Sequence, residues 1–559
     1  MVHRLPIRSA REWRDPMMSR PNSIDLEPIR TAIKERLLTR RDLLRSSALG
    51  LSLAWLPAVA AAAGSSPSGR VVVYSQASES SPIDPHTSVG EVTETVNTVM
   101  FDRLINRNLT RPYPGEQAPP IVPVLARSWS VSADATTFTF KLRKGVRFHD
   151  GTQFNAAAAK FNIERMGVKS SPNYYDKAGA VTAFLWHHLS GVETPDDETL
   201  VLHLSSPFAE LPSMMCESTG NPAMISPPQV KKVGNANFGE HPVGTGPYVY
   251  VSRQRGVEIV FKANPQPWPG GRTPSGPGIT FRPIPDLAAR VNALKTGAVD
   301  GINFPSADAI QDLQRLGFGL SRGLTPATYY LSMNMQEKPF QDVRVRQAVN
   351  HAIDREALAK DLWKGVVTPW DQVVAPTSGT AAPGIKGYPY DPARAKALLA
   401  QAGYPSGFDT VFAANDALFE PTPSAVADQL SKVGIRAKLE FTEWLTYFGA
   451  WAGGMKPGIG LNIMSWGMNS PWWLNHVFVN FNTGHIDNEQ ILKLLAQADR
   501  EIDETKRLKI YQQVSRLDVE QAYHAPLYTD TLSVMLSAKV RGFVHAKNWW
   551  FDLSTVSVS

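Results

Sequence analysis

Apolar and polar residues alternate in short runs through the first half of the chain beyond residue 70. In one such run Phe138, Phe140 and Leu142 stand at every second position among polar neighbours. This alternation predicts half-buried β-strands, because successive side chains of a strand point to opposite faces. The predicted strands cover residues 71–74, 136–143, 199–204, 277–284 and, as a pair joined across Arg255 and Gly256, 246–263.

From about Leu324 onward, helical and strand-like patterns take turns along the chain. Asp342 and Asp391 each precede an apolar stripe at helical spacing and can cap a helix, with Pro392 in the first turn of the second helix. Helices are predicted over residues 91–105, 342–352, 390–403, 423–433 and 489–521, the last with Ile502 on its apolar face. Strands are predicted over residues 329–335, 408–414, 437–444, 460–466 and 533–537.

This succession of elements indicates an α/β protein, in which helices cover the faces of sheets. A chain of 559 residues also exceeds the size at which a single hydrophobic core stops growing, so two or more lobes are expected. The change of pattern near Leu324 is a candidate boundary between them.

The segment before the first strand has the composition of an export signal. The twin arginines Arg40 and Arg41 precede an apolar stretch, residues 48–63, that ends in small residues. This order is typical of a Tat signal peptide. The stretch is short for a membrane span and is interrupted by Pro57. We therefore expect residues 1–63 to be a cleaved leader.

The positive charge of the chain is concentrated in this leader. The formal net charge is +6, and the chain after residue 63 is close to neutral. A nucleic-acid partner is therefore not expected. Cys216 is the single cysteine, so no internal disulfide forms, and no cysteine near the cleavage region can accept a lipid. These features predict a periplasmic protein that is not lipid-anchored.

Common catalytic signatures are absent from the sequence, which has no G-x-S-x-G, H-E-x-x-H, P-loop or G-x-G-x-x-G motif. His187 and His188 are adjacent, and neighbours on a helix or strand point apart, so they are not expected to form a metal pair. A turn explains His149 beside Asp150 and Gly151. We expect no catalytic residue, no metal site and no cofactor.

Residues 465–473, SWGMNSPWW, gather three of the 14 tryptophans around Asn469 without a charged residue. Tryptophan is usually interior, so packing is the expected role of Trp472 and Trp473. A polar Asn469 beside a turn-forming Ser-Pro also suits a wall against which a ligand packs. Both interpretations are open from the residues of this stretch alone.

Segments spread over nearly all of residues 70–550 resemble the peptide/nickel-type extracellular solute-binding proteins of ABC transporters, family 5. The block FTFKLRKGVRFHDGT is the most specific of them. The glycine-rich turns in these blocks are expected to serve the backbone rather than to contact a ligand. Further matching segments are residues 83–86, 122–156, 241–250, 287–302, 340–358, 387–408 and 525–529.

This resemblance implies an α/β fold of the type-2 periplasmic-binding-protein class, with two lobes, a hinge and an extra domain inserted in the first lobe. Lobe I would cover residues 70–325, with the inserted part near 100–240, and residues 528–559 would return to it. Lobe II would cover residues 326–527. The hinge would lie where the chain crosses between the lobes, near residues 324–330 and 526–529.

The resemblance also implies a ligand-binding wall in lobe II. In peptide-binding members a tryptophan follows an acidic residue at one strand end, which corresponds to Trp444 here. A Gly-Trp-x-x-Asp motif follows the next strand, and this chain has Ser465, Trp466, Gly467, Met468 and Asn469 in its place. The aspartate of the motif pairs with a peptide's N-terminal ammonium, whereas an amide carries no charge and makes a weaker hydrogen bond. A peptide with a free N-terminus is therefore a weakened expectation. Neutral polyols, blocked peptides, opine-like or sugar-phosphate ligands and metal chelates become alternatives.

The implied function is that of a periplasmic substrate-binding component of an ABC importer. As a monomer, the protein would capture a peptide-like or other small polar solute between its lobes. It would deliver the solute to permease subunits in the inner membrane, which are driven by a separate ATPase. Two alternatives are a sensory binding protein that presents its ligand to a receptor, and an exported enzyme.

Overall fold

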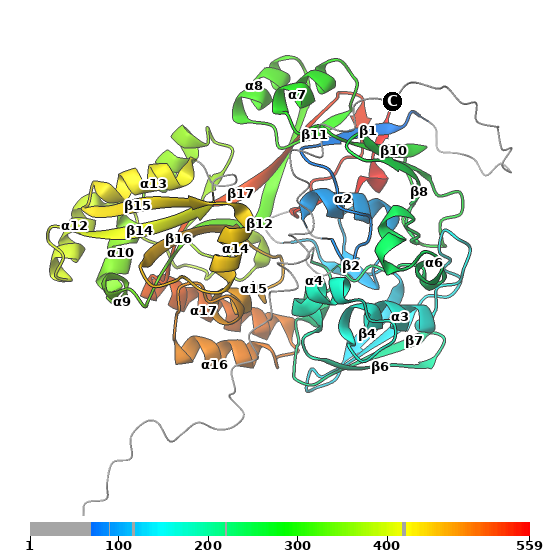
Figure 1. Cartoon of the computed structure of the whole chain (residues 1–559), viewed down its shortest axis with the longest axis horizontal. Coiled ribbons are helices and arrows are strands. Elements are labelled where there is room, and N and C mark those ends of the chain that lie inside the picture. Colours follow the sequence, from blue (N-terminus) through cyan, green and yellow to red (C-terminus); the bar gives the residue numbers. More distant parts are fainter. Residues whose placement is uncertain (1–68, 89, 114–117, 218–220, 416–420) are drawn as a thin grey trace, which may run out of the picture.

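The computed structural model describes residues 69–559 except for 89, 114–117, 218–220 and 416–420, and it leaves the side chains of Trp444 and Leu445 undescribed. The predicted leader, including Arg40 and Arg41, therefore lies outside the described residues. Two α/β lobes share one mixed sheet of 11 strands that runs through the molecule (Figure 1).

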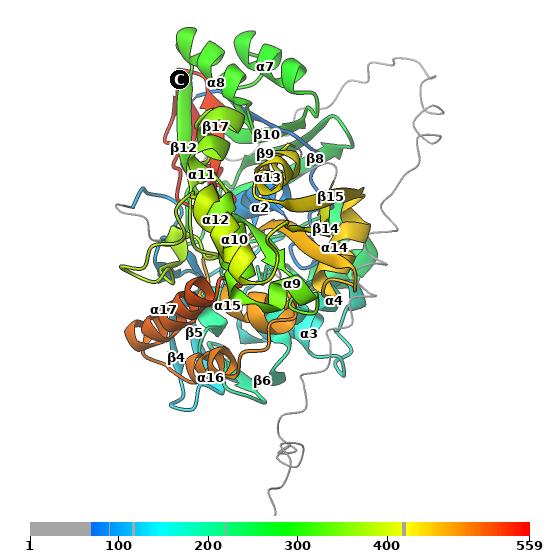
Figure 2. The same cartoon turned by 90° about the vertical axis from the view of Figure 1, so that its left-hand side faces the viewer.

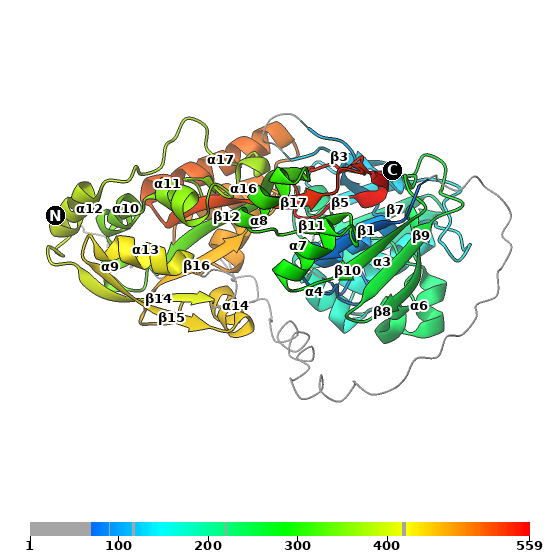
Figure 3. The same ribbon diagram turned by 90° about the horizontal axis from the view of Figure 1, so that it is seen from above.

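Two long antiparallel strands connect the lobes. β12 (Gly319–Met333) and β17 (His524–Leu536) pair along most of their length, and both pass between the lobes in Figure 3. Both strands begin well before the predicted ones, which started at Tyr329 and Ser533. The missed residues of β17 are buried almost throughout, so the alternation that predicts a half-buried strand is lost there. The missed start of β12 is exposed or half-buried up to Leu324 and contains Gly319, Gly323 and Pro326, which are poor strand formers.

The strands of lobe I point their carboxyl ends toward lobe II. β1 (Val72–Gln76) is parallel to β10 (Gly278–Pro283) and β11 (Gly301–Asn303), and β11 pairs antiparallel with the end of β17. Because β17 runs from lobe II into lobe I, the antiparallel β11 runs the opposite way. Antiparallel strands β9 (Glu258–Ala263) and β8 (Tyr248–Gln254) complete this half of the sheet.

The strands of lobe II point their carboxyl ends back toward lobe I. β14 (Phe408–Asn415) lies parallel between β15 (Ile435–Thr442) and β16 (Ile459–Trp466). β16 pairs antiparallel with β12, with Trp466 opposite Thr328. β12 runs from lobe I into lobe II, so β16 and its two parallel neighbours run the opposite way.

A bulge interrupts the pairing of β12 with β17 between the two halves of the sheet. The register shifts between Leu324 and Thr328, so that three residues of β12 face Asp530 alone. Pro326 lies in this bulge and has no N–H group to leave unpaired. The Thr325 hydroxyl donates to the main-chain carbonyl of Asp530 at 3.4 Å. The crossing between the lobes is thus an irregular but hydrogen-bonded stretch of sheet.

A separate antiparallel sheet lies beside the lobe I half, with strand order β4-β5-β7-β6. The alternating runs predicted β5 (Thr137–Leu142) and β7 (Thr199–Leu204) correctly. The other members and the covering helices are β4 (Ala126–Val131), β6 (Leu189–Asp196), α3 (Ala156–Gly167) and α4 (Asp176–Trp186). Two-stranded pairs are β2 (Ile105–Arg107) with β3 (Ile121–Pro123), and β18 (Val540–Arg541) with β19 (Ser557–Val558).

The predicted helix caps of lobe II are confirmed. The Asp342 carboxylate accepts from the N–H of Arg344 at the start of α10 (Val343–Ala352), and Asp391 accepts from Arg394 at the start of α12 (Pro392–Gln401). α10 contacts both α12 and α13 (Thr422–Ser431), and the three helices lie together in Figure 2.

Two predicted helices have different limits. The segment predicted as one helix over 489–521 forms α16 (Glu489–Ala498) and α17 (Glu504–Gln521), because Asp503 caps a new helix by accepting from the N–H of Lys506. Ile502 lies between them and is 45% exposed, so its predicted place on the apolar face is wrong. The helix predicted over 91–105 ends at Met100 as α2 (Glu91–Met100).

Buried apolar side chains join the two lobes into one contiguous cluster, which includes Phe184 and Phe208 of lobe I and Trp472 and Phe481 of lobe II. No helix in the described part of the chain is long and apolar enough to cross a membrane. The remaining helices and one short strand are α5 (Leu211–Met214), α6 (Pro227–Val233), α7 (Leu287–Lys295), α8 (Ala307–Arg315), α9 (Lys338–Gln341), α11 (Arg355–Ala357), β13 (Thr368–Pro369), α14 (Trp444–Ala452) and α15 (Trp473–Asn475).

Candidate functional site

The carboxyl ends of the two sets of parallel strands face each other across the bulge of β12. In α/β sheets, ligands bind outside the carboxyl ends of the strands. The region between these ends, which we call the inter-lobe site, is therefore the candidate functional site. The strand ends that border it are Gln76, Pro283 and Asn303 in lobe I, and Asn415, Thr442 and Trp466 in lobe II.

Gly467 anchors the segment that leaves β16 against the bulge. A Cβ added to Gly467 would lie 1.6 Å from the main-chain oxygen of Pro326, so only glycine fits. The main-chain carbonyl of Gly467 accepts from Trp549 Nε1 at 3.3 Å. The Ser465–Asn469 stretch thus starts from a position that is fixed relative to the crossing.

The Trp466 indole is half-buried in a group of aromatic rings. Its centroid lies 5.8 Å from that of Trp451 and 6.2 Å from that of Trp473, with interplanar angles of 17° and 24°. The rings of Phe448 and Phe481 lie 5.5 and 6.0 Å away. Stacked pairs of this kind add about 0.5–1.5 kcal/mol beyond burial. Trp466 therefore offers a fixed apolar surface at the end of its strand.

Asn469 is buried between the lobes, with 2% of its surface exposed. Its Nδ2 donates to the main-chain oxygen of Lys547 at 3.3 Å and to Asn548 Oδ1 at 3.1 Å, both on the C-terminal return to lobe I. Its Oδ1 has no hydrogen-bond partner among the described residues. A carboxylate could not bond to the main-chain oxygen of Lys547, and it could pair with Asn548 only after rotation of that amide to present its unpartnered Nδ2.

Two buried glutamates of lobe I contact the same segment. The main-chain N–H groups of Asn469 and Ser470 lie near the Glu217 carboxylate. Burial raises the pKa of Glu217, and the nearby guanidinium of Arg107 partly offsets this rise. The Ser470 hydroxyl donates to Glu210 at 3.3 Å, and Arg507 Nε of α17 donates to the same carboxylate. Removing one partner from such a buried ion pair costs about 3–5 kcal/mol.

Trp472 and Trp473 are buried, at 4% and 1% exposure, and the packing role expected of them is confirmed. Trp472 also packs across to lobe I, 5.2 Å from Phe208 and 5.5 Å from His187 between ring centroids. The expectation that His187 and His188 point apart is wrong. They lie in a turn after α4, where neither helix nor strand geometry separates them, and their ring centroids are 3.8 Å apart.

His476 also lies at this contact, on a π-helical turn at residues 476–480. Its ring centroid is 4.8 Å from Phe184 of α4 and 4.8 Å from Trp472. Burial, followed by the nearby His187, lowers the pKa of His476 to about 3. Its ring is therefore neutral at physiological pH while the lobes are in contact.

The structure brings Ser465, Trp466, Gly467, Met468 and Asn469 together at the inter-lobe site, with Met468 buried. Trp444 begins α14, and its side chain lies outside the described residues. Sequence reasoning missed the lobe I partners of this segment, Glu210, Glu217 and Asn548. They lie far from it in the chain, and no local pattern connects them.

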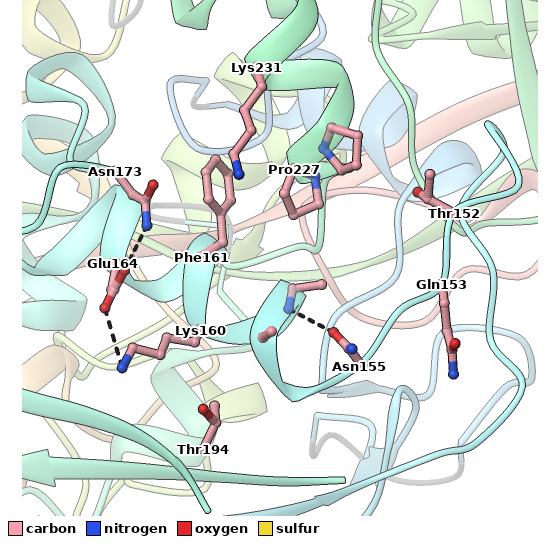
Figure 4. A pocket seen from close by; sticks show the side chains of 13 residues that line it. Thr152, Gln153, Asn155, Lys160, Phe161, Glu164, Asn173, Thr194, Pro227 and Lys231 are labelled. Atoms are coloured by element: carbon pink, nitrogen blue, oxygen red, sulfur yellow. Dashed lines mark hydrogen bonds and ion pairs between the residues drawn. The ribbon is translucent and has the colours of Figure 1, made fainter. Parts of the chain in front are cut away.

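A groove of about 440 Å³ opens within lobe I between α3 and α6 (Figure 4). Its Glu164 accepts from Asn173 Nδ2 at 2.8 Å and pairs with Lys160 at 3.8 Å, and Asn155 caps α3. These contacts stabilise local structure, so the groove is a weaker candidate than the inter-lobe site. Over the described residues, no group of three or more His, Cys, Asp and Glu side chains could hold a metal ion.

Known proteins share this architecture. The family model for bacterial extracellular solute-binding proteins, family 5 Middle, matches residues 120–485. The glutathione-binding protein GsiB of Escherichia coli O1:K1 / APEC is 30% identical over 514 residues, which cover 89% of this chain and 95% of that protein.

Two solved structures extend the likeness to three dimensions. The periplasmic binding protein DppA from Helicobacter pylori, in complex with peptide STSA, has a TM-score of 0.71 and 24% identity over 88% of this chain and 98% of that one. The PBP AgaA in complex with agropinic acid, from A. tumefacien R10, has a TM-score of 0.69 and 25% identity over 88% and 99%. The likeness therefore concerns the whole two-lobed fold.

Replacement of Gly467 by alanine should strongly destabilise the protein, because the new methyl group meets the backbone of the bulge. We expect a loss of at least about 3 kcal/mol in the free energy of unfolding, measured by denaturant titration. Gly319→Ala is the matched control on β12, where an added Cβ meets only ordinary contacts at 3.8 Å. Equal stability of the two variants would contradict the close approach of Gly467 to Pro326.

Acidification should weaken the protein through His476. An unfolded histidine titrates near pH 6.5, so protonation favours the unfolded chain as the pH falls below that value. At pH 5 the cost approaches about 2 kcal/mol. The melting temperature of His476→Phe should therefore fall less between about pH 7 and pH 5 than the melting temperature of the wild-type protein. Asp499 contributes in the opposite direction, because burial and the nearby Glu210 raise its pKa to about 7. This contribution is the same in both proteins and cancels in the comparison. Parallel pH profiles would overturn this role of His476.

Proposed function

The chain belongs to the bacterial extracellular solute-binding proteins of family 5, and from this premise we propose that it captures a small peptide or peptide-like solute in the inter-lobe site. One observation carries the proposal: the carboxyl edges of the two half-sheets face each other, with the half-buried Trp466 at one of them. A solute bound there contacts both lobes at once.

Capture involves closure of the lobes and no bond-making step. Lobe I, residues 70–325 with the return 528–559, turns relative to lobe II, residues 326–527, about the crossing of β12 and β17. The bulge opposite Asp530 is the natural place for this motion, because few ladder hydrogen bonds resist it there. A solute drives closure to the extent that it binds the closed state more tightly than the open one.

The proposed wall consists of Trp444, Ser465, Trp466, Gly467, Met468 and Asn469. Trp466 supplies apolar contact, and Gly467 lets the main chain approach the crossing. Asn469 contributes to closure by donating to the C-terminal return of lobe I. The names of the relatives support the solute class: GsiB is a glutathione-binding protein, and the DppA and AgaA structures contain a peptide and agropinic acid.

The closed protein then delivers its solute to permease subunits of an ABC importer in the inner membrane, which a separate ATPase drives. It acts as a monomer in the periplasm, without a lipid anchor and without catalytic activity. A sensory binding protein that presents the same solute to a receptor is the second candidate, because closure of the lobes would serve either partner.

Trp466→Ala should weaken solute binding by at least about tenfold, since it removes most of the apolar surface at the end of β16. Isothermal titration of the mature protein with glutathione, trialanine and agropinic acid measures the affinity. Trp129→Ala is the matched control, because Trp129 is also half-buried but lies in the separate sheet of lobe I. If no small solute binds the wild-type protein, the proposed function fails. If both variants bind alike, Trp466 is not part of the wall.

Replacement of Arg40 and Arg41 by lysine should leave the uncleaved precursor in the cytoplasm, because the Tat machinery reads the twin arginines. Cell fractionation and immunoblotting measure the distribution. Replacement of Arg4 and Arg8 by lysine, also in the leader, is the control and should leave export unchanged. Normal export of the Arg40/Arg41 variant would overturn the Tat assignment.

A further inference from the structure

We propose that the inter-lobe site takes a solute with a cationic group, a protonated amine or a guanidinium, and that Asp530 is the carboxylate that binds it. This inference rests on the proposed function and specifies the charge of the solute. It differs from recognition of a peptide ammonium at position 469, where this chain has an uncharged amide that is occupied by lobe I.

Asp530 occupies the point where the lobes meet. It is the one residue of β17 opposite the bulge of β12, and its side chain is half-buried. It lies close to Tyr329 and Tyr528, whose rings are 4.6 Å apart, and the Tyr329 hydroxyl is hydrogen-bonded to Ser465 of the proposed wall. The carboxylate therefore lies near Ser465 of the wall.

No cation of the described chain neutralises Asp530. The Asp530 carboxylate is affected by burial and accepts one hydrogen bond, from the N–H of Thr531 at 2.8 Å. No positively charged group of the described residues acts on it. The internal stretches outside the description contain no lysine or arginine. Burial raises the pKa of Asp530 to about 6, which is the response of a carboxyl group without a positive partner.

Arg322 of β12 and Lys547 of the C-terminal return are engaged by other groups. Arg322 donates to Ser533 Oγ at 3.2 Å and to the carbonyl of Gly365 at 3.2 Å. Ser533 is three positions from Asp530, and residues an odd number apart point to opposite faces of a strand. Lys547 Nζ donates to the carbonyl of Tyr113 at 2.9 Å. The carboxylate of Asp530 is thus left for a ligand.

A second, half-buried carboxyl group, Glu91, lies at the facing edge. Glu91 opens α2, and its oxygens contact Asn303 Nδ2 at the end of β11 and the Thr95 hydroxyl, each at 3.4 Å. Burial raises the pKa of Glu91 to about 8, so this group is mostly neutral at pH 7 and Asp530 is the carboxylate that carries charge. Asn303, which contacts Glu91, pairs with Val534 of β17. Val534 is four positions from Asp530, which places the contact of Glu91 with Asn303 about 13 Å from Asp530 along the strand.

The segments that leave the carboxyl ends of the strands contribute no cation of their own. Those described after β1, β10, β11 and β16 cover residues 77–88, 284–286, 304–306 and 467–472, and none of them contains a lysine or arginine. Arg253 and Arg290 reach these segments from other elements and donate to main-chain oxygens of residues 80, 81, 284, 285 and 304, so the charge argument depends on Asp530 itself. Closure of the lobes removes water from the Asp530 carboxylate. A cationic solute then stabilises its charge, whereas with a neutral solute the carboxylate must take up a proton.

The test uses probe pairs that differ in one charge. Trialanine and N-acetyl-trialanine differ in the α-ammonium, and N-acetyl-Ala-Arg-Ala and N-acetyl-Ala-citrulline-Ala differ only in a guanidinium against a urea. We expect the cationic member of at least one pair to bind at least about tenfold more tightly, and Asp530→Asn to remove most of that preference. Asp409→Asn, at the other end of a lobe II strand and exposed, is the matched control.

Calorimetry near pH 6 in two buffers of different ionisation enthalpy gives a second readout. A cationic probe should bind wild type without proton uptake, whereas any neutral probe that binds should take up a proton that Asp530→Asn abolishes. Equal affinities within both pairs, or a preference that survives Asp530→Asn, would overturn the inference while leaving the binding function intact.

If none of the four peptides binds, the protein is purified from its own periplasm and the solute that it releases is identified by mass spectrometry. The charge of that solute then tests the inference. A cationic solute supports the inference, and a neutral or anionic one overturns it. If no small solute binds or co-purifies, the proposed function fails and the inference fails with it.

Discussion

The whole structure depends on two strands that belong to both lobes. β12 and β17 pair within lobe I and again within lobe II, and the bulge opposite Asp530 is the larger of two register shifts between them, the other lying between Tyr329 and Tyr330. Because the strands of each lobe take their direction from this pair, the carboxyl edges of the two half-sheets must face each other. The approach of Gly467 to Pro326 then sets where the aromatic wall begins relative to the crossing.

Contact between the lobes combines favourable packing with a polar cost. The rings of Phe184, Phe208, Trp472 and His476 pack across the boundary. Several buried polar atoms at this boundary have no hydrogen-bond partner among the described residues: Asn469 Oδ1, Trp473 Nε1, Asn475 Nδ2 and His476 Nε2. Each unmade bond of this kind costs about 1–3 kcal/mol. Closure is therefore finely balanced, and a solute that contributes a few kcal/mol can decide it.

Local patterns predicted much of the fold and only one side of the site. Strands such as β5 and β7, and the caps at Asp342 and Asp391, follow from interactions within a few residues. Near-continuous burial removed the alternation that marks a strand in β17, and two glycines and Pro326 obscured the start of β12. The wall from Ser465 to Asn469 came from a family resemblance, whereas its partner Glu217 lies about 250 residues away and is brought there only by tertiary packing.

The identity of residue 469 shows how binding and closure are linked. Asparagine suits its surroundings, because its amide donates to two oxygens of the C-terminal return and it lies near the buried Glu217 carboxylate. An aspartate there would face those acceptors and a second buried carboxylate, and without a cationic ligand it would oppose closure. A neutral side chain at 469 lets the lobes meet whatever the solute carries. The recognition of charge then passes to Asp530 at the crossing, where a solute and the hinge act on the same residues.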